Sequence, residues 1–487
     1  MLRHLRLCRV DVDAVSLFGC RRPFLRSCSS HRSVLSDSPA AAAKDPRWVM
    51  LNLHGRRMDN SFVADAKTVA DSRTHFTDDG PQHLRVSLGG AAPPASSFLY
   101  YDFPDSVPGE DEEEDYGDIS VDVVAAHTDS VLLRLGDKHY LSATFEDNDF
   151  FVYRAGAAGP PSLSLLPDRD FLTKVESNHA KYVLRPAVRP ALWSGSTGLL
   201  RRGENENDLL VVEVDQWYDR EAQQEMLEFC VLRTGTSTGT GTGTGTDMPQ
   251  WELMEPVPIL LDNNEVAPRL SSGNAIIPVG DRYLCWVDYE NGFFLCDMAD
   301  EASPKVRYVP VPAEVSRCCS SDDYVRDYNQ HDDVFRLKYS LKMGSVGASK
   351  VRFVSVSPHC CCGGPGRSTC AHSRFAFTVT TWTMDLSMDM ESPLTWVKDG
   401  EVDCEEIWAL PGYEGLPRAN LECPMVSLED PNVVCFLVSN NRYFTTYEDR
   451  KVWMIQLNIN TKTLLSVVQF SNDHWNAYYH LPAQLQY

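Results

Sequence analysis

The sequence lacks an apolar segment long enough to cross a membrane. None of its uninterrupted apolar runs approaches the roughly 18 to 20 residues that a spanning helix needs. Basic residues are also scarce, because 45 Lys and Arg stand against 68 Asp and Glu in 487 residues and give a formal net charge of −23. Nucleic-acid binding rewards a basic face. We therefore expect neither a membrane nor a nucleic acid as partner.

Three common catalytic motifs are missing from the chain. Gly-x-Ser-x-Gly does not occur, and the Gly/Ser stretches at 195–198 and 344–347 miss its spacing. The phosphate-loop pattern Gly-x-x-x-x-Gly-Lys-Ser/Thr and the zinc-protease pattern His-Glu-x-x-His are also absent. The sequence thus assigns no catalytic residue and no bound cofactor.

No Asn-x-Ser/Thr acceptor for N-glycosylation occurs, and the 15 cysteines are clustered in a long chain. A disulfide framework is typical of short secreted chains with regularly spaced cysteines. Both features favour a reducing compartment.

The first 45 residues differ in composition from the rest and predict a separate leader. Residues 1–36 carry seven arginines, no lysine and two acidic residues, with many serines and no apolar core of a secretory signal. This composition is typical of a mitochondrial transit peptide. The alternative is a disordered basic leader without an address, in a cytoplasmic or nuclear protein.

From Trp48 onward, short apolar runs alternate with polar residues and are separated by turn residues about every ten positions. Ile119, Val121 and Val123 form one such run, and the segments 131–135, 375–379 and 453–459 follow the same rule. A period of two places each apolar set on one face of a strand. About twenty such segments predict an all-β fold of half-buried antiparallel sheets.

So many short strands must protect their edges by closure or stacking. We expect a β-propeller-like fold of about five or six blades, with two β-sandwich-like domains as the alternative. Residues 46–233 and 251–487 are the predicted N-terminal and C-terminal β regions. A Gly/Thr repeat, which has no side chain able to form a core, makes 234–250 a flexible loop between them.

Local patterns also predict individual turns and one helix. Asn291-Gly292 and Asp399-Gly400 are pairs that tolerate positive φ, so each predicts a two-residue hairpin turn. Asp288 is placed to accept backbone hydrogen bonds from its own turn. The best helical segment, 219–228, is short.

The densest set of metal-ligating residues lies in 359–372. His359, Cys362, Cys370 and His372 are candidate ligands for a zinc ion that would fold this Gly- and Pro-containing loop back on itself. The spacing does not favour such a site, since no Cys-x-x-Cys occurs in it. We therefore predict a variable surface loop and keep zinc as the alternative.

The segment from Trp286 to Met298, followed by 307–312, resembles the signature of a plant family catalogued as domain of unknown function 1618 (DUF1618), which is abundant in grasses. The segments 46–52, 124–134, 149–153 and 251–253 resemble the same family. The apolar strand with its Trp-Val-Asp turn is also similar to repeats of plant F-box-associated domains, which implies a propeller-like fold.

These features together predict a non-enzymatic β-propeller-like module that binds an unidentified protein partner through loops at one face of its sheets. The alternative is an enzyme whose site lies in the central channel of the propeller, built from polar residues at the ends of several strands. The substrate of such an enzyme is not specified by the sequence.

Overall fold

The structure is a computed structural model, which divides the chain into a unit of residues 1–44 and a compact unit of residues 45–487. Only parts of the second unit are described below. The described residues are 47–58, 65–74, 82–104, 119–137, 148–156, 159–167, 192, 195–203, 208–219, 221–234, 249–261, 268–270, 275–300, 303–315, 339–359, 375–387, 390–440, 451–470 and 480–485. The predicted leader, the Gly/Thr repeat and Cys362, Cys370 and His372 lie outside them.

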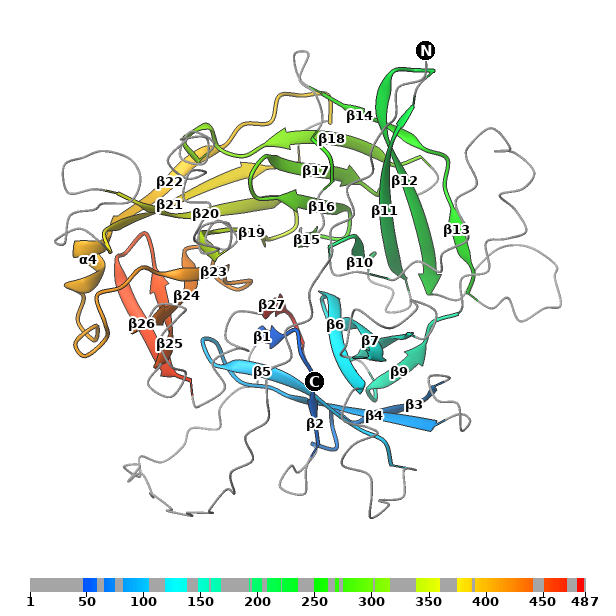
Figure 1. The fold of residues 1–487 in the computed structure, drawn as a ribbon, viewed down its shortest axis with the longest axis horizontal. Coiled ribbons are helices and arrows are strands. Elements are labelled where there is room, and N and C mark those ends of the chain that lie inside the picture. Colours follow the sequence, from blue (N-terminus) through cyan, green and yellow to red (C-terminus); the bar gives the residue numbers. More distant parts are fainter. Residues whose placement is uncertain are drawn as a thin grey trace, which may run out of the picture. The chain divides into compact units, whose positions relative to one another are not determined.

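The described strands form five sheets, one of which has nine strands (Figure 1). We divide the nine-stranded sheet in two and number the resulting groups as sheets 1 to 6. Sheet 1 takes its strands from both ends of the chain: β1 (Val49–Asn52), β2 (Arg56–Arg57), β3 (Ala70–Thr74), β4 (Gln82–Gly89), β5 (Ser96–Asp102) and β27 (His480–Ala483). Sheet 2 is a meander of β6 (Ile119–His127), β7 (Ser130–Asp137), β8 (Asp149–Arg154) and β9 (Ser162–Leu165). Sheet 3 consists of β10 (Thr197–Arg201), β11 (Leu209–Asp219), β12 (Gln224–Thr234) and β13 (Trp251–Leu253).

Sheets 4 to 6 are meanders of four strands each. Sheet 4 consists of β15 (Ala275–Val279), β16 (Tyr283–Asp288), β17 (Gly292–Asp297) and β18 (Lys305–Pro310). Strand β14 (Val257–Leu260) pairs with both β12 and β18 and so connects sheets 3 and 4. Sheet 5 consists of β19 (Leu341–Val346), β20 (Lys350–Pro358), β21 (Phe377–Asp385) and β22 (Val397–Asp403), which the short helix α4 (Cys404–Trp408) follows. Sheet 6 consists of β23 (Glu422–Val426), β24 (Val433–Ser439), β25 (Val452–Asn458) and β26 (Thr463–Gln469).

The prediction of an all-β fold of antiparallel sheets is confirmed. The predicted helix at 219–228 is wrong, because β11 and β12 pair in register from Leu209↔Thr234 to Asp219↔Gln224 and form a long hairpin across this segment. Asp219 caps the turn of that hairpin by accepting hydrogen bonds from the backbone N–H groups of Glu221 and Ala222. The polar residues that suggested a short helix thus serve a turn.

Six apolar clusters join the sheets in a cyclic order. Each cluster draws its buried residues mainly from two consecutive sheets, and the last joins sheet 6 to sheet 1. Residues that represent the six clusters in order are Leu84 with Val121, Leu132 with Leu199, Phe229 with Trp286, Phe293 with Phe353, Phe377 with Phe436, and Met50 with Leu437. Because every sheet has a neighbour on both faces, its central strands are buried on both.

In sheet 4 this packing corrects the expectation of half-buried strands. In β16 and β17 every residue is buried, and alternate side chains enter different clusters. Cys285 and Val287 pack between sheets 4 and 5, whereas Leu284 and Trp286 pack between sheets 3 and 4. The period of two is therefore present, but both faces of the strand are apolar faces.

The two ends of the described chain pair with each other in sheet 1. Strand β27 is antiparallel to β1 with Leu51 opposite Leu481, and β1 is parallel to β5. The buried ring of His480 reinforces this pairing, since its Nε2 lies 2.7 Å from Ser96 Oγ and 3.5 Å from Asn52 Nδ2. The cyclic order of sheets is thus closed by strands more than 400 positions apart in the sequence.

The hairpin at Asp288 forms as expected in one respect and differs in another. Asp288 accepts hydrogen bonds from the Glu290 backbone N–H at 3.0 Å and the Asn291 side-chain amide at 2.8 Å. The predicted two-residue turn at Asn291-Gly292 is wrong, because Gly292 already pairs with Asp288 as a strand residue. A glycine is required there for space, since a Cβ would lie 2.3 Å from the Val309 carbonyl oxygen.

The predicted turn at Asp399-Gly400 is also wrong, because both residues lie inside strand β22. The register shifts there, so that Thr381 pairs with Gly400 and Trp382 with Lys398, which leaves Asp399 as the extra residue of a β-bulge. A Cβ on Gly400 would lie 2.5 Å from Thr381 Oγ1, so the bulge needs a glycine. Asp399-Gly400 thus forms a bulge, in which the Asp399 carboxylate accepts a hydrogen bond from Arg352.

Candidate functional site

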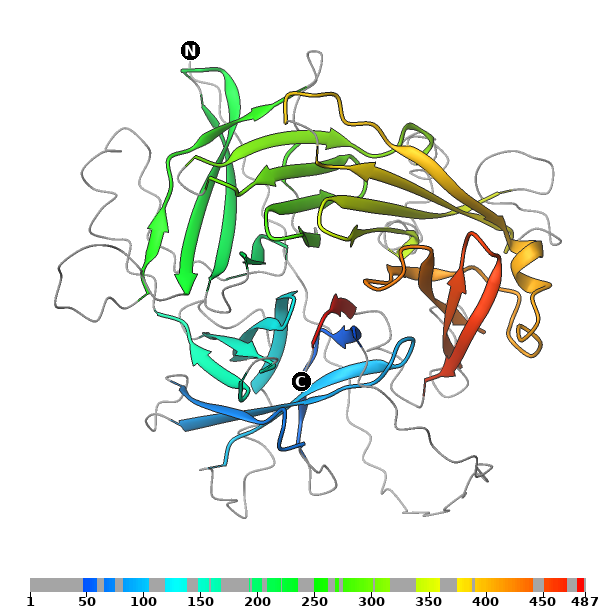
Figure 2. The ribbon, with the colours of Figure 1, turned by 180° about the vertical axis from the view of Figure 1, so that it is seen from behind.

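A cavity of about 510 Å³ lies where the first strands of the sheets meet. Its lining comes from β6, β10, β15, β19 and β23 and, in sheet 1, from the terminal strand β27. These strands follow one another around the middle of the described unit, as both views show (Figures 1 and 2). Ligand pockets commonly measure 300 to 1,000 Å³ and combine apolar walls with a few convergent polar groups. The cavity is therefore the main candidate site.

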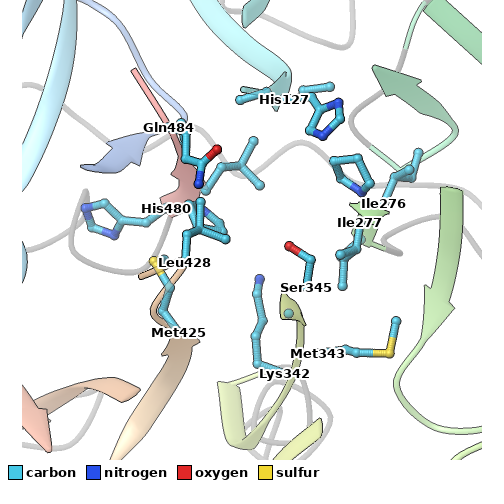
Figure 3. A pocket seen from close by; sticks show the side chains of 18 of the residues that line it. His127, Ile276, Ile277, Lys342, Met343, Ser345, Met425, Leu428, His480 and Gln484 are labelled. Carbon is cyan, nitrogen blue, oxygen red and sulfur yellow. The ribbon is translucent and has the colours of Figure 1, made fainter. Parts of the chain in front are cut away.

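Apolar side chains and tight backbone contacts form much of its wall. Ile276, Ile277, Met343, Met425 and Leu428 line it from three different sheets (Figure 3). At one end the backbones of sheets 4 and 5 approach closely at Gly280, where φ is +57° and a Cβ would lie 2.2 Å from the Ala348 carbonyl oxygen. Only glycine combines this conformation with this approach.

At the C-terminal ends of β6 and β10, the polar groups are paired with each other. His127 Nδ1 accepts a hydrogen bond from the Arg201 backbone N–H at 2.9 Å, so the neutral ring carries its proton on Nε2. The Arg201 guanidinium forms an ion pair with the buried carboxylate of Asp129. Burial, with the charge of Arg201, lowers the pKa of His127 to about 4, although Asp129 and Asp281 act in the opposite direction. His127 is therefore neutral at pH 7.

Near the starts of β10 and β19, three polar groups lining the cavity have no partner among the described residues. Thr197 is fully buried, and neither its Oγ1 nor the buried hydroxyl of Tyr289 makes a hydrogen bond. Lys342 is half-buried and forms no hydrogen bond or ion pair within the described part of the chain. Figure 3 shows its ammonium group directed into the cavity beside Ser345. Buried polar groups are nearly always paired, so each of these unpaired groups in the lining calls for a ligand or a water molecule.

Near the start of β19 the charge of the lining favours an anion. Lys342 and Arg201 are its cations and Asp281 is its carboxylate, and Arg201 is already neutralised by Asp129. Asp281 follows Gly280 and so lies near the C-terminal end of β15. Tyr289 lies near the other end, where Ala275 pairs with Val287. An unpaired ammonium with a serine hydroxyl group beside it, as at Lys342 and Ser345, can bind a carboxylate or a phosphate.

Of the four sequence-predicted zinc ligands, only His359 lies in the described part of the chain. It follows β20, and its Nε2 lies 3.0 Å from Asp403 Oδ2. The thiol of Cys404 donates a hydrogen bond of 3.6 Å to the other oxygen of Asp403. Burial raises the pKa of Cys404 to about 11, so the thiol is protonated at pH 7. The sequence prediction missed Asp403 and Cys404 because they lie more than 40 positions away, beyond another strand.

Fold and site thus define an all-β protein with a partly polar cavity at the meeting point of its sheets. Residues 286–435 match the family described as "Protein of unknown function (DUF1618)". The match runs from β16 to β24 and confirms the predicted resemblance over this stretch. It includes Lys342 and Ser345 but not Thr197, His127 or His480, so it covers only part of the cavity lining.

A search of the curated proteins finds none that is similar to this chain. No helix in the described ranges combines the length and the apolar character needed to span a membrane. The plant origin, the likeness to F-box-associated domains and the mitochondrial address stay predictions.

Proposed function

We propose that this chain is a non-enzymatic protein-interaction module in which sheets 1 to 6 are the blades of a β-propeller-like ring. The cyclic order of the six apolar clusters and the closure of sheet 1 by both chain ends support this arrangement. A closed ring leaves the outer strand of each sheet as a short edge at which a partner can bind.

The observation that carries the interaction role is the outer strand β26. It ends the order of sheet 6, so one of its edges has no strand partner among the described residues. Its residues alternate between exposed and half-buried, and the exposed set includes Leu465 and Val467, which are 52% and 37% exposed. An exposed apolar edge strand is a template for an added strand of another protein.

The partner that fits this edge is a protein with an extended basic segment that carries alternating apolar side chains. Backbone groups of the segment would pair with the free edge of β26, and its apolar side chains would cover Leu465 and Val467. The formal net charge of −23 favours a basic partner through electrostatic attraction.

The test compares two lysine-substituted full chains in co-purification with chemical cross-linking. L465K combined with V467K is expected to lose a stoichiometric, basic partner whose cross-links map to β26. V397K places the same charge on the outer strand of sheet 5, where Val397 is 61% exposed, and is expected to retain that partner. A partner kept by both variants, or cross-linked away from β26, would contradict the assignment.

The second candidate function is an enzyme or ligand-binding site for a small anionic molecule in the central cavity. The specific observation is the unpaired set of Lys342, Thr197 Oγ1 and Tyr289 OH. We propose that the ligand is a small carboxylate or phosphate, held by Lys342 and the two hydroxyl groups.

Calorimetric titration with citrate and with inorganic phosphate tests this second candidate and separates the two chemistries. K342M is expected to weaken binding of the preferred anion at least about tenfold, since each charge-assisted hydrogen bond contributes 1.5 to 3 kcal/mol. K342R is expected to keep most of it, and K350M, which changes a lysine in the next strand, serves as the control. Binding that K342M leaves unchanged would eliminate the cavity as the anion site. Turnover is then sought among anions that bind.

A further inference from the structure

The end of sheet 5 brings together three side chains with metal-ligating atoms from two separate segments. His359 comes from the end of β20, while Asp403 and Cys404 come from the junction of β22 and α4. The imidazole nitrogen, a carboxylate oxygen and the thiol sulfur all lie within 4.8 Å of one another. We propose that these three residues form a zinc site.

The present contacts have nearly the spacing that a bound zinc ion requires. Zinc bonds of about 2.0 to 2.3 Å in a tetrahedron place neighbouring ligand atoms roughly 3.3 to 3.7 Å apart. His359 Nε2 lies 3.0 Å from Asp403 Oδ2, and Cys404 Sγ lies within 4.8 Å of the imidazole nitrogen and of a carboxylate oxygen. Separation of the imidazole and carboxylate by a few tenths of an ångström opens the position for the ion.

The surrounding structure holds each ligand in place. The His359 backbone N–H donates to the Ala376 carbonyl oxygen at 3.1 Å, which fixes the end of β20 beside β21. Asp403 is the N-cap of α4, and its Oδ1 accepts from the Glu405 backbone N–H at 2.9 Å. With Oδ1 held by the helix, Oδ2 remains directed at His359 and available to the metal, which is the role of outer contacts in metal sites.

Burial and exposure divide the site into a fixed side and an open side. Cys404 is only 1% exposed and belongs to the apolar cluster between sheets 5 and 6, so its sulfur has a fixed position. The side chains of His359 and Asp403 are 31% and 42% exposed, so a metal ion and a water molecule can reach them. When zinc binds, the Cys404 thiol loses one proton to solvent and the thiolate forms the bond to the metal. The neutral His359 ring carries its proton on Nδ1 in this state, so that the lone pair of Nε2 binds the metal. Water completes the four-coordinate sphere.

The test measures metal binding to the full chain after treatment with a chelator. One zinc per chain is expected from elemental analysis, and Co²⁺ in its place is expected to give a thiolate-to-metal absorption band. C404S is expected to abolish this band, and both C404S and H359Q are expected to weaken zinc binding more than about 100-fold, beyond the effect of losing an outer contact. H359Q changes a partly exposed residue and so tests the site even if C404S folds poorly.

Two controls distinguish this site from other assignments. H54Q alters a comparable pair, His54 with Asp122 at 2.9 Å, where an arginine rather than a thiol contacts the carboxylate, and is expected to retain zinc. The combination of C362S and C370S, the cysteines predicted from sequence, is also expected to retain it. Absence of zinc binding by the wild-type chain, survival of binding in both C404S and H359Q, or its loss in C362S with C370S would overturn the proposal.

Discussion

Two cations of sheet 5 differ completely in their surroundings. Arg352 on β20 is 5% exposed and donates to Asp399 Oδ2 at 2.5 Å, to the Pro431 carbonyl oxygen and to Thr383 Oγ1 at 3.3 Å. Lys342 on the adjacent strand β19 lines the cavity and contacts no partner among the described residues. The difference separates a charge that joins sheets 5 and 6 from a charge that is available to a ligand.

The carboxylate opposite Arg352 is as fully satisfied as the arginine. Burial raises the pKa of Asp399, but hydrogen bonds from Thr383 at 2.6 Å, Thr381 at 2.7 Å and Arg352 outweigh it and hold the pKa below its usual value. Asp399 is therefore charged at neutral pH. By contrast, the hydroxyl groups of Thr197 and Tyr289 in the cavity lining make no hydrogen bond within the described part of the chain.

The largest expected difference in the free energy of unfolding is between variants that lack Arg352 and variants that lack Lys342. R352M is expected to lower the free energy of unfolding by about 3 to 5 kcal/mol, because it removes the hydrogen bonds that the buried guanidinium donates to the Asp399 carboxylate and to the Pro431 carbonyl oxygen. K342M is expected to change it by less than about 0.5 kcal/mol, since no hydrogen bond or ion pair within the described part of the chain is lost. Urea unfolding measures both. Equal losses of unfolding free energy in the two variants would contradict the distinction between a structural Arg352 and a Lys342 that is available to a ligand.

The next effect concerns pH at the paired end of the cavity. The pKa of His127 is about 4 in the folded chain and about 6.5 when unfolded, so between these values only the unfolded chain takes up the proton. Stability is therefore full above pH 6.5 and falls as the pH drops from 6.5 to 4, by roughly 3 kcal/mol in total. Unfolding at a series of pH values is expected to show this slope, and H127Q is expected to flatten it. An unchanged slope in H127Q would contradict the assignment.

The smallest expected difference in stability is between variants of two fully buried threonines, Thr381 and Thr197. T381V removes a hydrogen bond to the charged Asp399 and is expected to cost about 1.5 to 3 kcal/mol. T197V removes a hydroxyl group that has no partner, so we expect a change within about 0.5 kcal/mol, or stabilisation. Thermal unfolding of both variants measures the difference. A cost for T197V as large as that for T381V would show that its hydroxyl group is paired in solution.

The sequence predicts those parts of the structure that depend on nearby residues. The strands predicted from alternation at 119–123 and 131–135 and the Asp288 turn follow from side chains within a few positions of one another. The Asp399 bulge could not be predicted in this way, because its reason is Arg352, 47 positions earlier. Asp399-Gly400 has the composition of a turn, and only the tertiary contact shows that it is not one.

The candidate sites escape sequence reasoning for the same reason. The cavity takes its polar groups from segments between His127 and Gln484, and none of these segments carries a recognisable motif. His359 was found by its cysteine-rich neighbours, whereas its contacts in the structure are with Asp403, 44 positions later, and the adjacent Cys404. Spacing along the chain carries no information about ligands that sheet pairing brings together.

Hydrogen exchange in the first and last strands tests most directly whether the sheets close cyclically. Chain ends normally fray and exchange quickly, so slow exchange there requires pairing. In native-state exchange followed by mass spectrometry, peptides covering 48–53 and 480–485 are expected to be protected to a degree comparable with the buried hairpin of β16 and β17. Exchange of these two peptides at the rate of an unstructured chain would contradict the closure.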